Sequence, residues 1–100
     1  MIRVAIIGTG NIANAHMEAY KTLKDHCRVT ALVDIIPGKA RQFMERHGLT
    51  CDVYERHEDI LGRGDIDLAD ICTPPYTHAS ISVGCLYAGI FRVLGKRQKT

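Results

Sequence analysis

The sequence predicts an α/β fold in which helices cover both faces of a doubly wound parallel sheet. Short apolar segments rich in β-branched residues alternate along the chain with segments whose apolar residues recur every three or four positions. A glycine-rich segment follows the first apolar segment directly, and an aspartate closes the second. Strands that alternate with helices favour right-handed crossovers, which place successive strands parallel in one sheet.

The first strand and the first helix are predicted at the start of the chain. Residues 2–7 form an apolar run interrupted only by Arg3, which is typical of a strand covered on both faces. From Ile12 the apolar spacing changes to three and four residues, which predicts a helix that ends near Lys24. Its inward stripe is expected to contain Ile12, Ala15, His16, Ala19, Tyr20 and Leu23.

A second strand and helix follow in the same order. Residues 29–33 form a mainly apolar strand that ends at Asp34. Pro37 then opens a helix, because a proline in the first helical turn loses no hydrogen bond. Gly48 is expected to end this helix in the left-handed conformation. The inward stripe of the helix is expected to contain Ala40, Phe43, Met44 and His47.

The second half of the chain repeats the pattern. A short strand over 51–54 and a brief helix over 58–61 precede a strand over 68–72. A Thr-Pro-Pro break follows this strand, because the residue before a proline disfavours helix. The next helix is expected over 78–88, with Thr77 as its N-cap.

The domain is expected to span residues 1–94. Gly89 ends the last helix, residues 91–94 form a fifth strand, and residues 95–100 form a basic, solvated tail. The length suits one small domain. The sheet is expected to be incomplete at its C-terminal end, and an exposed edge strand favours a homo-oligomer or aggregation.

The composition excludes several classes of protein. The chain has 100 residues, of which 46% are hydrophobic and 24% charged, and its net charge of +2 is too small to indicate a nucleic-acid partner. A membrane span needs an apolar run of roughly 20 residues, and the sequence has none. With no signal peptide, the protein is expected in the cytoplasm, where thiols stay reduced.

The cysteines lack the spacing of metal ligands, so no metal site is expected. They are predicted to be reduced thiols, and two of them are predicted to be buried in apolar surroundings, Cys72 and Cys85. The other two are Cys27 and Cys51.

The segment after the first strand has the pattern GxGxxA, from Gly8 to Ala13. Gly8 permits a tight turn, and Gly10 lets a pyrophosphate approach the backbone. The small Ala13 lets the helix pack closely on the strand. The free N–H groups and the positive dipole at the helix start favour bound phosphate, so the segment predicts a dinucleotide site.

Asp34 strengthens this prediction because it ends the second strand, 26 residues after Gly8. The usual spacing is roughly 20 residues. Its carboxylate is suited to accept hydrogen bonds from the adenosine ribose and to repel a 2′-phosphate, which favours NAD over NADP. The alternative is a structural glycine turn with a solvated acid at the end of the strand.

The Thr-Pro-Pro break lies at the carboxyl end of the fourth strand, where open α/β sheets bind ligands. This rigid loop is therefore expected to lie along the nicotinamide half of a cofactor, and His78 begins the next helix. The residues favour a purely structural interpretation equally: the prolines end the strand, and His78 helps to cap the next helix.

Together these segments resemble the N-terminal domain of the glucose-fructose oxidoreductase, inositol dehydrogenase and rhizopine catabolism (Gfo/Idh/MocA) family. The resemblance covers residues 2 to about 89, through VAIIGTGNIANAH, ALVDIIPGKA and IDLADICTPPYTHA. It implies a Rossmann-like fold and NAD(P)-dependent oxidation or reduction of a hydroxyl or carbonyl on a sugar, cyclitol or related compound. It implies cofactor contacts from Gly8, Thr9, Gly10, Asn11, Ile12, Asp34, Thr73, Pro74 and His78, whereas His16 matches a structural position.

The resemblance fails after Gly89, where the family continues into a Glu-Lys-Pro motif that carries a catalytic lysine. Lys96 lies near that position between Gly95 and Arg97, so no catalytic residue is assigned. The family's substrate domain is absent as well. We therefore expect a truncated or frameshifted product, or else a stand-alone domain.

Three functions remain open from the sequence. The first is the cofactor domain of an oxidoreductase, which needs a substrate domain for turnover. The second is a non-catalytic module whose bound dinucleotide stabilises the fold or a partner interface. The third is a remnant that binds nothing.

Overall fold

The computed structural model describes residues 1–94, and the predicted tail over 95–100 and Lys96 lie outside the described residues. Five parallel strands form one sheet in the order β3-β2-β1-β4-β5. The strands are β1 (Ile2–Ile7), β2 (Cys27–Val33), β3 (Asp52–Tyr54), β4 (Leu68–Ile71) and β5 (Phe91–Leu94). The predicted α/β class and doubly wound sheet are confirmed, since this order is that of a Rossmann-type sheet with five strands.

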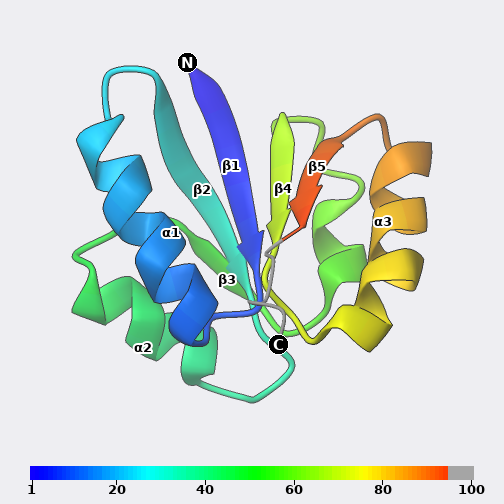
Figure 1. Cartoon of the computed structure of the whole chain (residues 1–100), viewed down its shortest axis with the longest axis horizontal. Helices are drawn as coiled ribbons and strands as arrows, with labels where there is room; N and C mark the ends of the chain where they lie inside the picture. The colour runs from blue at the N-terminus through cyan, green and yellow to red at the C-terminus, as the bar shows by residue number, and fades with distance from the viewer. Residues whose placement is uncertain (95–100) are drawn as a thin grey trace.

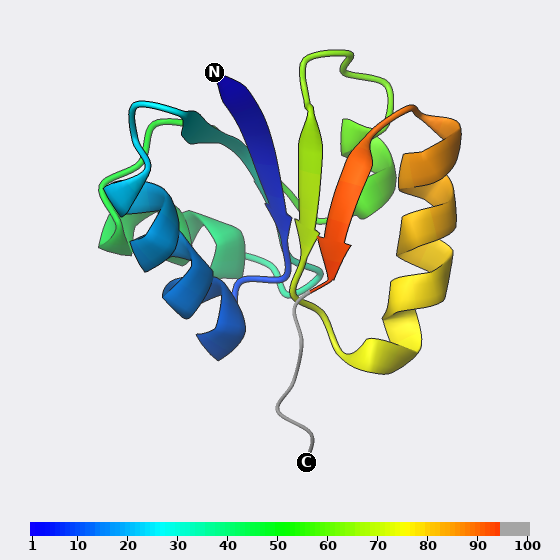
Figure 2. The same ribbon diagram turned by 45° about the horizontal axis from the view of Figure 1, so that its top comes forward.

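Helices cover both faces of the sheet (Figures 1 and 2). Two lie on one face, α1 (Asn11–Thr22) and α2 (Lys39–Arg46), and the third, α3 (His78–Tyr87), lies on the other. Two short 3₁₀ helices complete the elements, η1 (His57–Ile60) and η2 (Pro75–Thr77). No helix among residues 1–94 is long and apolar enough to span a bilayer.

Alternate residues along the strands pack into two hydrophobic cores, one on each face of the sheet. In β1, Val4 and Ile6 pack under α1 and α2 with Phe43, whereas Ala5 and Ile7 pack in the core on the α3 side. All four strand residues are 2% exposed or less. A strand with both faces buried is an uninterrupted apolar run, so the first strand was predicted with its correct bounds.

The first helix packs along a different stripe from the predicted one. Ala13 and Met17 are its buried residues, whereas Ala15, Ala19 and Leu23 are exposed. The apolar spacing alone did not separate these stripes, because alanines lie on both sides of the helix. The helix ends at Thr22, and the N–H of Leu23 donates to the carbonyl groups of Ala19 and Tyr20 in its closing turn.

The second helix begins two residues later than predicted. Gly38 lies between Pro37 and the helix with φ +81°, a left-handed conformation that a right-handed helix excludes. At the other end, Gly48 has φ +65°, as predicted for a helix-ending glycine. The predicted buried positions Ala40 and Phe43 are confirmed.

Thr77 is the N-cap residue of the third helix, as predicted, but its side chain makes no capping hydrogen bond. Thr77 has helical dihedral angles because η2 runs directly into α3. Its hydroxyl instead donates to the carbonyl of Pro74, at 2.6 Å. The remaining predicted elements differ by a residue or two at their ends, as is usual for element boundaries.

Candidate functional site

A groove of about 490 Å³ lies at the carboxyl ends of β1, β2 and β4. Its lining includes six of the predicted cofactor residues, Gly8, Thr9, Gly10, Asp34, Thr73 and Pro74. These residues come from three different strand ends, which the parallel sheet brings to one edge. Such an edge is where doubly wound sheets bind ligands, so the topology places the groove at the expected position.

The turn after β1 is built by the two glycines. Gly8 has φ +94°, and a Cβ there would lie 2.9 Å from the Thr73 methyl carbon and 3.0 Å from the Cys72 backbone. Gly10 precedes α1 with φ −92°, and a Cβ there would meet no protein atom within 4 Å. The turn is therefore closed against β4 at Gly8 and open to a ligand at Gly10.

The N-terminus of α1 offers unpartnered donors to this open side. No side chain caps it and its first turn holds no acidic residue. The first N–H groups of a helix lack intrahelical acceptors, and the dipole makes that end positive. This arrangement suits an anionic phosphate.

Asp34 joins the glycine turn to β2. One carboxylate oxygen accepts hydrogen bonds from the backbone N–H and the hydroxyl of Thr9, at 2.9 and 2.7 Å, and the other accepts from the N–H of Ile36 at 3.0 Å. Burial acts to raise the pKa of Asp34, but the hydrogen bonds from Ile36 and Thr9 outweigh it and hold the pKa below its usual range. Asp34 is thus an ionised group with a structural role in the turn.

Three predicted residues do not line the main groove. Asn11 lines a neighbouring pocket of about 340 Å³ between the N-terminal part of α1 and the side of α2, together with Lys39 and Arg46. Ile12 lines neither pocket. The ring Nε2 of His78 lies 2.7 Å from the carbonyl oxygen of Thr73 and so fixes the shape of the break after β4.

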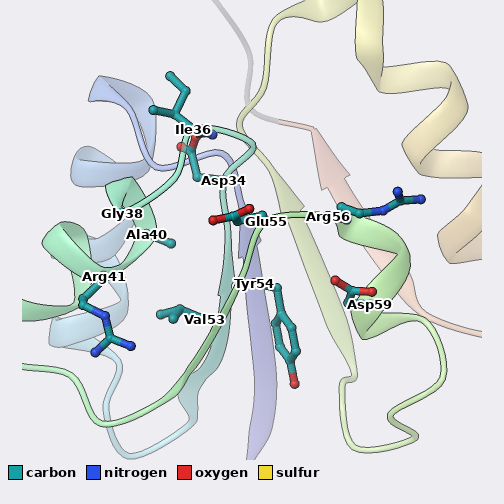
Figure 3. Close-up of a pocket in the computed structure, with 10 residues that line it drawn as sticks. All are labelled: Asp34, Ile36, Gly38, Ala40, Arg41, Val53, Tyr54, Glu55, Arg56 and Asp59. Atoms are coloured by element: carbon teal, nitrogen blue, oxygen red, sulfur yellow. Dashed lines mark hydrogen bonds between the residues drawn. The ribbon is translucent and has the colours of Figure 1, made fainter.

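A further pocket of about 470 Å³ adjoins Asp34 on its other side, between the segments that follow β2 and β3 (Figure 3). Ile36 and Asp34 lie at one end of this pocket and Val53 and Tyr54 at the other. The sequence did not predict this pocket, because the residues of β3 carry no ligand motif.

Asp70 is the main polar residue that the sequence analysis missed. Its side chain is fully buried and contacts His16, Tyr20 and Cys72. Burial and the charge of Asp70 raise the pKa of the Tyr20 hydroxyl and of the Cys72 thiol, so both groups are protonated donors. Cys72 packs against the apolar core on the α1 side, as predicted, but it is only partly buried and its thiol also donates to Asp70, whereas Cys85 is buried in the other apolar core.

A dinucleotide-binding domain of the Rossmann type is the class that the strand order, the glycine turn and the groove define together. The family described as "Oxidoreductase family, NAD-binding Rossmann fold" (Gfo/Idh/MocA) matches residues 2–95. The chain belongs to this oxidoreductase family, and the resemblance seen in the sequence is confirmed.

Individual relatives agree with this membership. The chain is 30% identical over 89 residues to an inositol 2-dehydrogenase/D-chiro-inositol 3-dehydrogenase of Lactiplantibacillus plantarum, which covers 89% of this chain and 25% of that protein. It is 30% identical over 91 residues to a 4-carboxy-2-hydroxymuconate-6-semialdehyde dehydrogenase of Sphingobium. That match covers 88% of this chain and 27% of the dehydrogenase. The chain thus spans about a quarter of the length of these relatives.

Solved structures have the same fold. The WlbA dehydrogenase of Chromobactrium violaceum, in complex with NADH and UDP-GlcNAcA, matches with a TM-score of 0.85 and 30% identity, over 93% of this chain and 26% of that one. A levoglucosan dehydrogenase in complex with NADH matches with a TM-score of 0.84 and 24% identity. The match covers 93% of this chain and 27% of the levoglucosan dehydrogenase.

Proposed function

We propose that this chain is the cofactor-binding part of an oxidoreductase and that it binds NAD in preference to NADP. The observation that carries the proposal is the contrast within the turn after β1, where Gly8 is packed against protein and Gly10 is open beside an uncapped helix end. A free backbone face at a helix N-terminus suits a pyrophosphate, because its N–H groups point at the anion.

Each part of the groove has a proposed role toward the dinucleotide. The backbone from Gly8 to Ile12, including Thr9, Gly10 and Asn11, holds the pyrophosphate. Asp34 accepts hydrogen bonds from the adenosine ribose through lone pairs that Thr9 and Ile36 leave free. Thr73 and Pro74 line the nicotinamide half, and His78 positions them through the Thr73 carbonyl.

The preference for NAD rests on the charge of Asp34. Its pKa lies below the usual range, so the carboxylate is negative at neutral pH and repels a 2′-phosphate. Lys39 lines both the groove and the neighbouring pocket and favours phosphate, which makes NADP the second candidate.

The chemistry depends on the rest of a full-length protein. NAD supplies hydride transfer when bound, and the residues of this chain bind and orient it. With a substrate domain we expect oxidation of a hydroxyl, or the reverse, on a sugar, cyclitol or related compound, as the names of the relatives suggest. The alternative is a dinucleotide-binding module without activity of its own.

The proposal extends to the compartment, the partners and the assembly of the protein. We expect a cytoplasmic protein, since all four cysteines are free thiols. We expect no nucleic-acid or membrane partner, and we expect β5 at the edge of the described sheet to favour a homo-oligomer.

Calorimetric titration with NAD and NADP tests the proposal on the wild-type chain and on Asp34→Asn, which keeps an acceptor oxygen for Thr9. We expect tighter binding of NAD by the wild type, by about tenfold or 1.4 kcal/mol, and a smaller preference in the variant. Equal affinities in the wild type would contradict the cofactor preference. A folded chain that binds neither nucleotide would contradict the function itself.

A further inference from the structure

Four polar side chains meet in the interior between α1 and β4. Asp70 lies at their centre and is 0% exposed. Its Oδ2 atom lies 2.7 Å from Nδ1 of His16 and accepts a hydrogen bond from the Tyr20 hydroxyl at 2.6 Å. Its Oδ1 atom accepts a hydrogen bond from the Cys72 thiol at 3.4 Å. A carboxylate, an imidazole and a thiol therefore face one another inside the fold.

The charge of this cluster is incompletely balanced. Among residues 1–94, no lysine or arginine forms an ion pair with Asp70, and its only basic partner is His16. A buried carboxylate is costly unless a positive charge compensates it. A divalent cation would supply that charge where the protein offers only one imidazole.

We propose that His16, Asp70 and Cys72 form a binding site for a borderline-soft divalent metal ion such as Zn²⁺. Nδ1 of His16, a carboxylate oxygen of Asp70 and Sγ of Cys72 are the three ligands, and they lie within 4.8 Å of one another. This donor set favours zinc and cobalt over magnesium and calcium, which prefer oxygen ligands throughout.

The distances within the cluster approach those of tetrahedral coordination. With Zn–N and Zn–S bonds of about 2.0 and 2.3 Å, neighbouring ligand atoms in a tetrahedron lie about 3.4–3.6 Å apart. Sγ of Cys72 lies 3.5 Å from Nδ1 of His16 and 3.4 Å from Oδ1 of Asp70. Nδ1 of His16 lies 2.7 Å from the other oxygen, Oδ2, so the His16 ring and the Asp70 carboxylate must both readjust before one oxygen joins Nδ1 and Sγ around the ion.

The exposure of His16 allows both this movement and entry of the ion. Its side chain is 31% exposed, whereas that of Asp70 is 1% exposed. The ring therefore has room to shift, and solvent reaches the cluster along its side. Tyr20 remains hydrogen-bonded to Asp70 and orients the carboxylate, as outer partners of metal ligands commonly do. The fourth position is available to water.

Binding replaces hydrogen bonds with metal bonds and releases protons. The Cys72 thiol gives its proton to solvent when its sulfur binds the ion as a thiolate. His16 binds through Nδ1 and keeps its remaining proton on Nε2. Asp70 lies 54 residues after His16 in the sequence, and Cys72 lies 56 residues after it. No local spacing motif therefore marks the site.

Titration of the chain with Co²⁺ tests the proposal by absorption spectroscopy, because cobalt bound to thiolate gives a charge-transfer band in the near ultraviolet. We expect one equivalent of Co²⁺ to produce that band and Zn²⁺ to abolish it. Cys72→Ser should lose the band, whereas the matched control Cys51→Ser should keep it. Tyr20→Phe should weaken binding by about tenfold, through the disturbed orientation of Asp70.

Thermal denaturation gives a second readout. Since a ligand that binds only the native state stabilises it, Zn²⁺ should raise the Tm of the wild type but not of Cys72→Ser, and Mg²⁺ should leave both unchanged. A folded wild type that gives no cobalt band would overturn the proposal, as would a band that persists in folded Cys72→Ser.

Discussion

Gly8 and Gly10 lie two residues apart in the same turn, yet their surroundings differ. Gly8 has a left-handed φ of +94° and faces Thr73 and the Cys72 backbone, so its missing side chain serves the contact between β1 and β4. Gly10 has no left-handed φ, and a Cβ added there would meet nothing within 4 Å, so no contact of the fold requires glycine at this position. One motif therefore contains a glycine that the fold requires and a glycine for which we propose a role in binding a ligand.

The largest expected effect comes from Gly8→Ala. The substitution forces a left-handed alanine and a contact of 2.9 Å with Thr73, where backbone atoms are also close. We expect the free energy of unfolding to fall by about 2–4 kcal/mol, which lowers the Tm by roughly 10 °C or more. Denaturant unfolding measures the change. A variant as stable as the wild type would mean that the turn is not closed against β4.

Asp34→Asn is expected to have an intermediate effect that depends on pH. Because the pKa of Asp34 is lowered in the folded state, its ionised form stabilises the protein above its ordinary pKa of 3.8, and this contribution is lost as the pH falls through the lower folded value. The variant should be less stable than the wild type at pH 6, and the difference should shrink below about pH 4. Urea unfolding over this pH range measures it, and a difference that grows toward acid would contradict the assignment.

His78→Ala is expected to have the smallest effect of the three. It removes the contact of 2.7 Å to the Thr73 carbonyl, which is worth about 1 kcal/mol of stability. His78→Gln, which keeps a donor, should recover part of the loss. If both variants weaken NAD binding strongly while stability is unchanged, His78 contacts the cofactor directly.

The sequence predicted the class of fold because strands buried on both faces, such as β1, appear as apolar runs. It predicted the glycine turn because Gly8, Gly10 and Ala13 lie together in the chain. The start of α2 was predicted too early because the sequence does not show that Gly38 adopts a left-handed conformation. Element ends thus depended on backbone conformations that residue type alone does not specify.

Contacts between distant residues account for most of what was missed at the site. The bond between Thr9 and Asp34 joins residues 25 positions apart, and the contact between His16 and Asp70 joins residues 54 apart. The first depends on how neighbouring strand ends are aligned and the second on how α1 packs on the sheet, and periodicity specifies neither. Asp34 was predicted as a ribose ligand, whereas its additional role in holding the turn emerges only from the structure.

Titration of NAD into Gly10→Ala shows whether Gly10 is reserved for a ligand. Added Cβ atoms meet no protein atom at this position, so we expect unfolding free energies within about 1 kcal/mol of the wild type. The affinity for NAD should fall at least about tenfold, because the methyl group occupies the approach of the pyrophosphate. Unchanged NAD affinity in this folded variant would contradict the assignment of the turn as the pyrophosphate site.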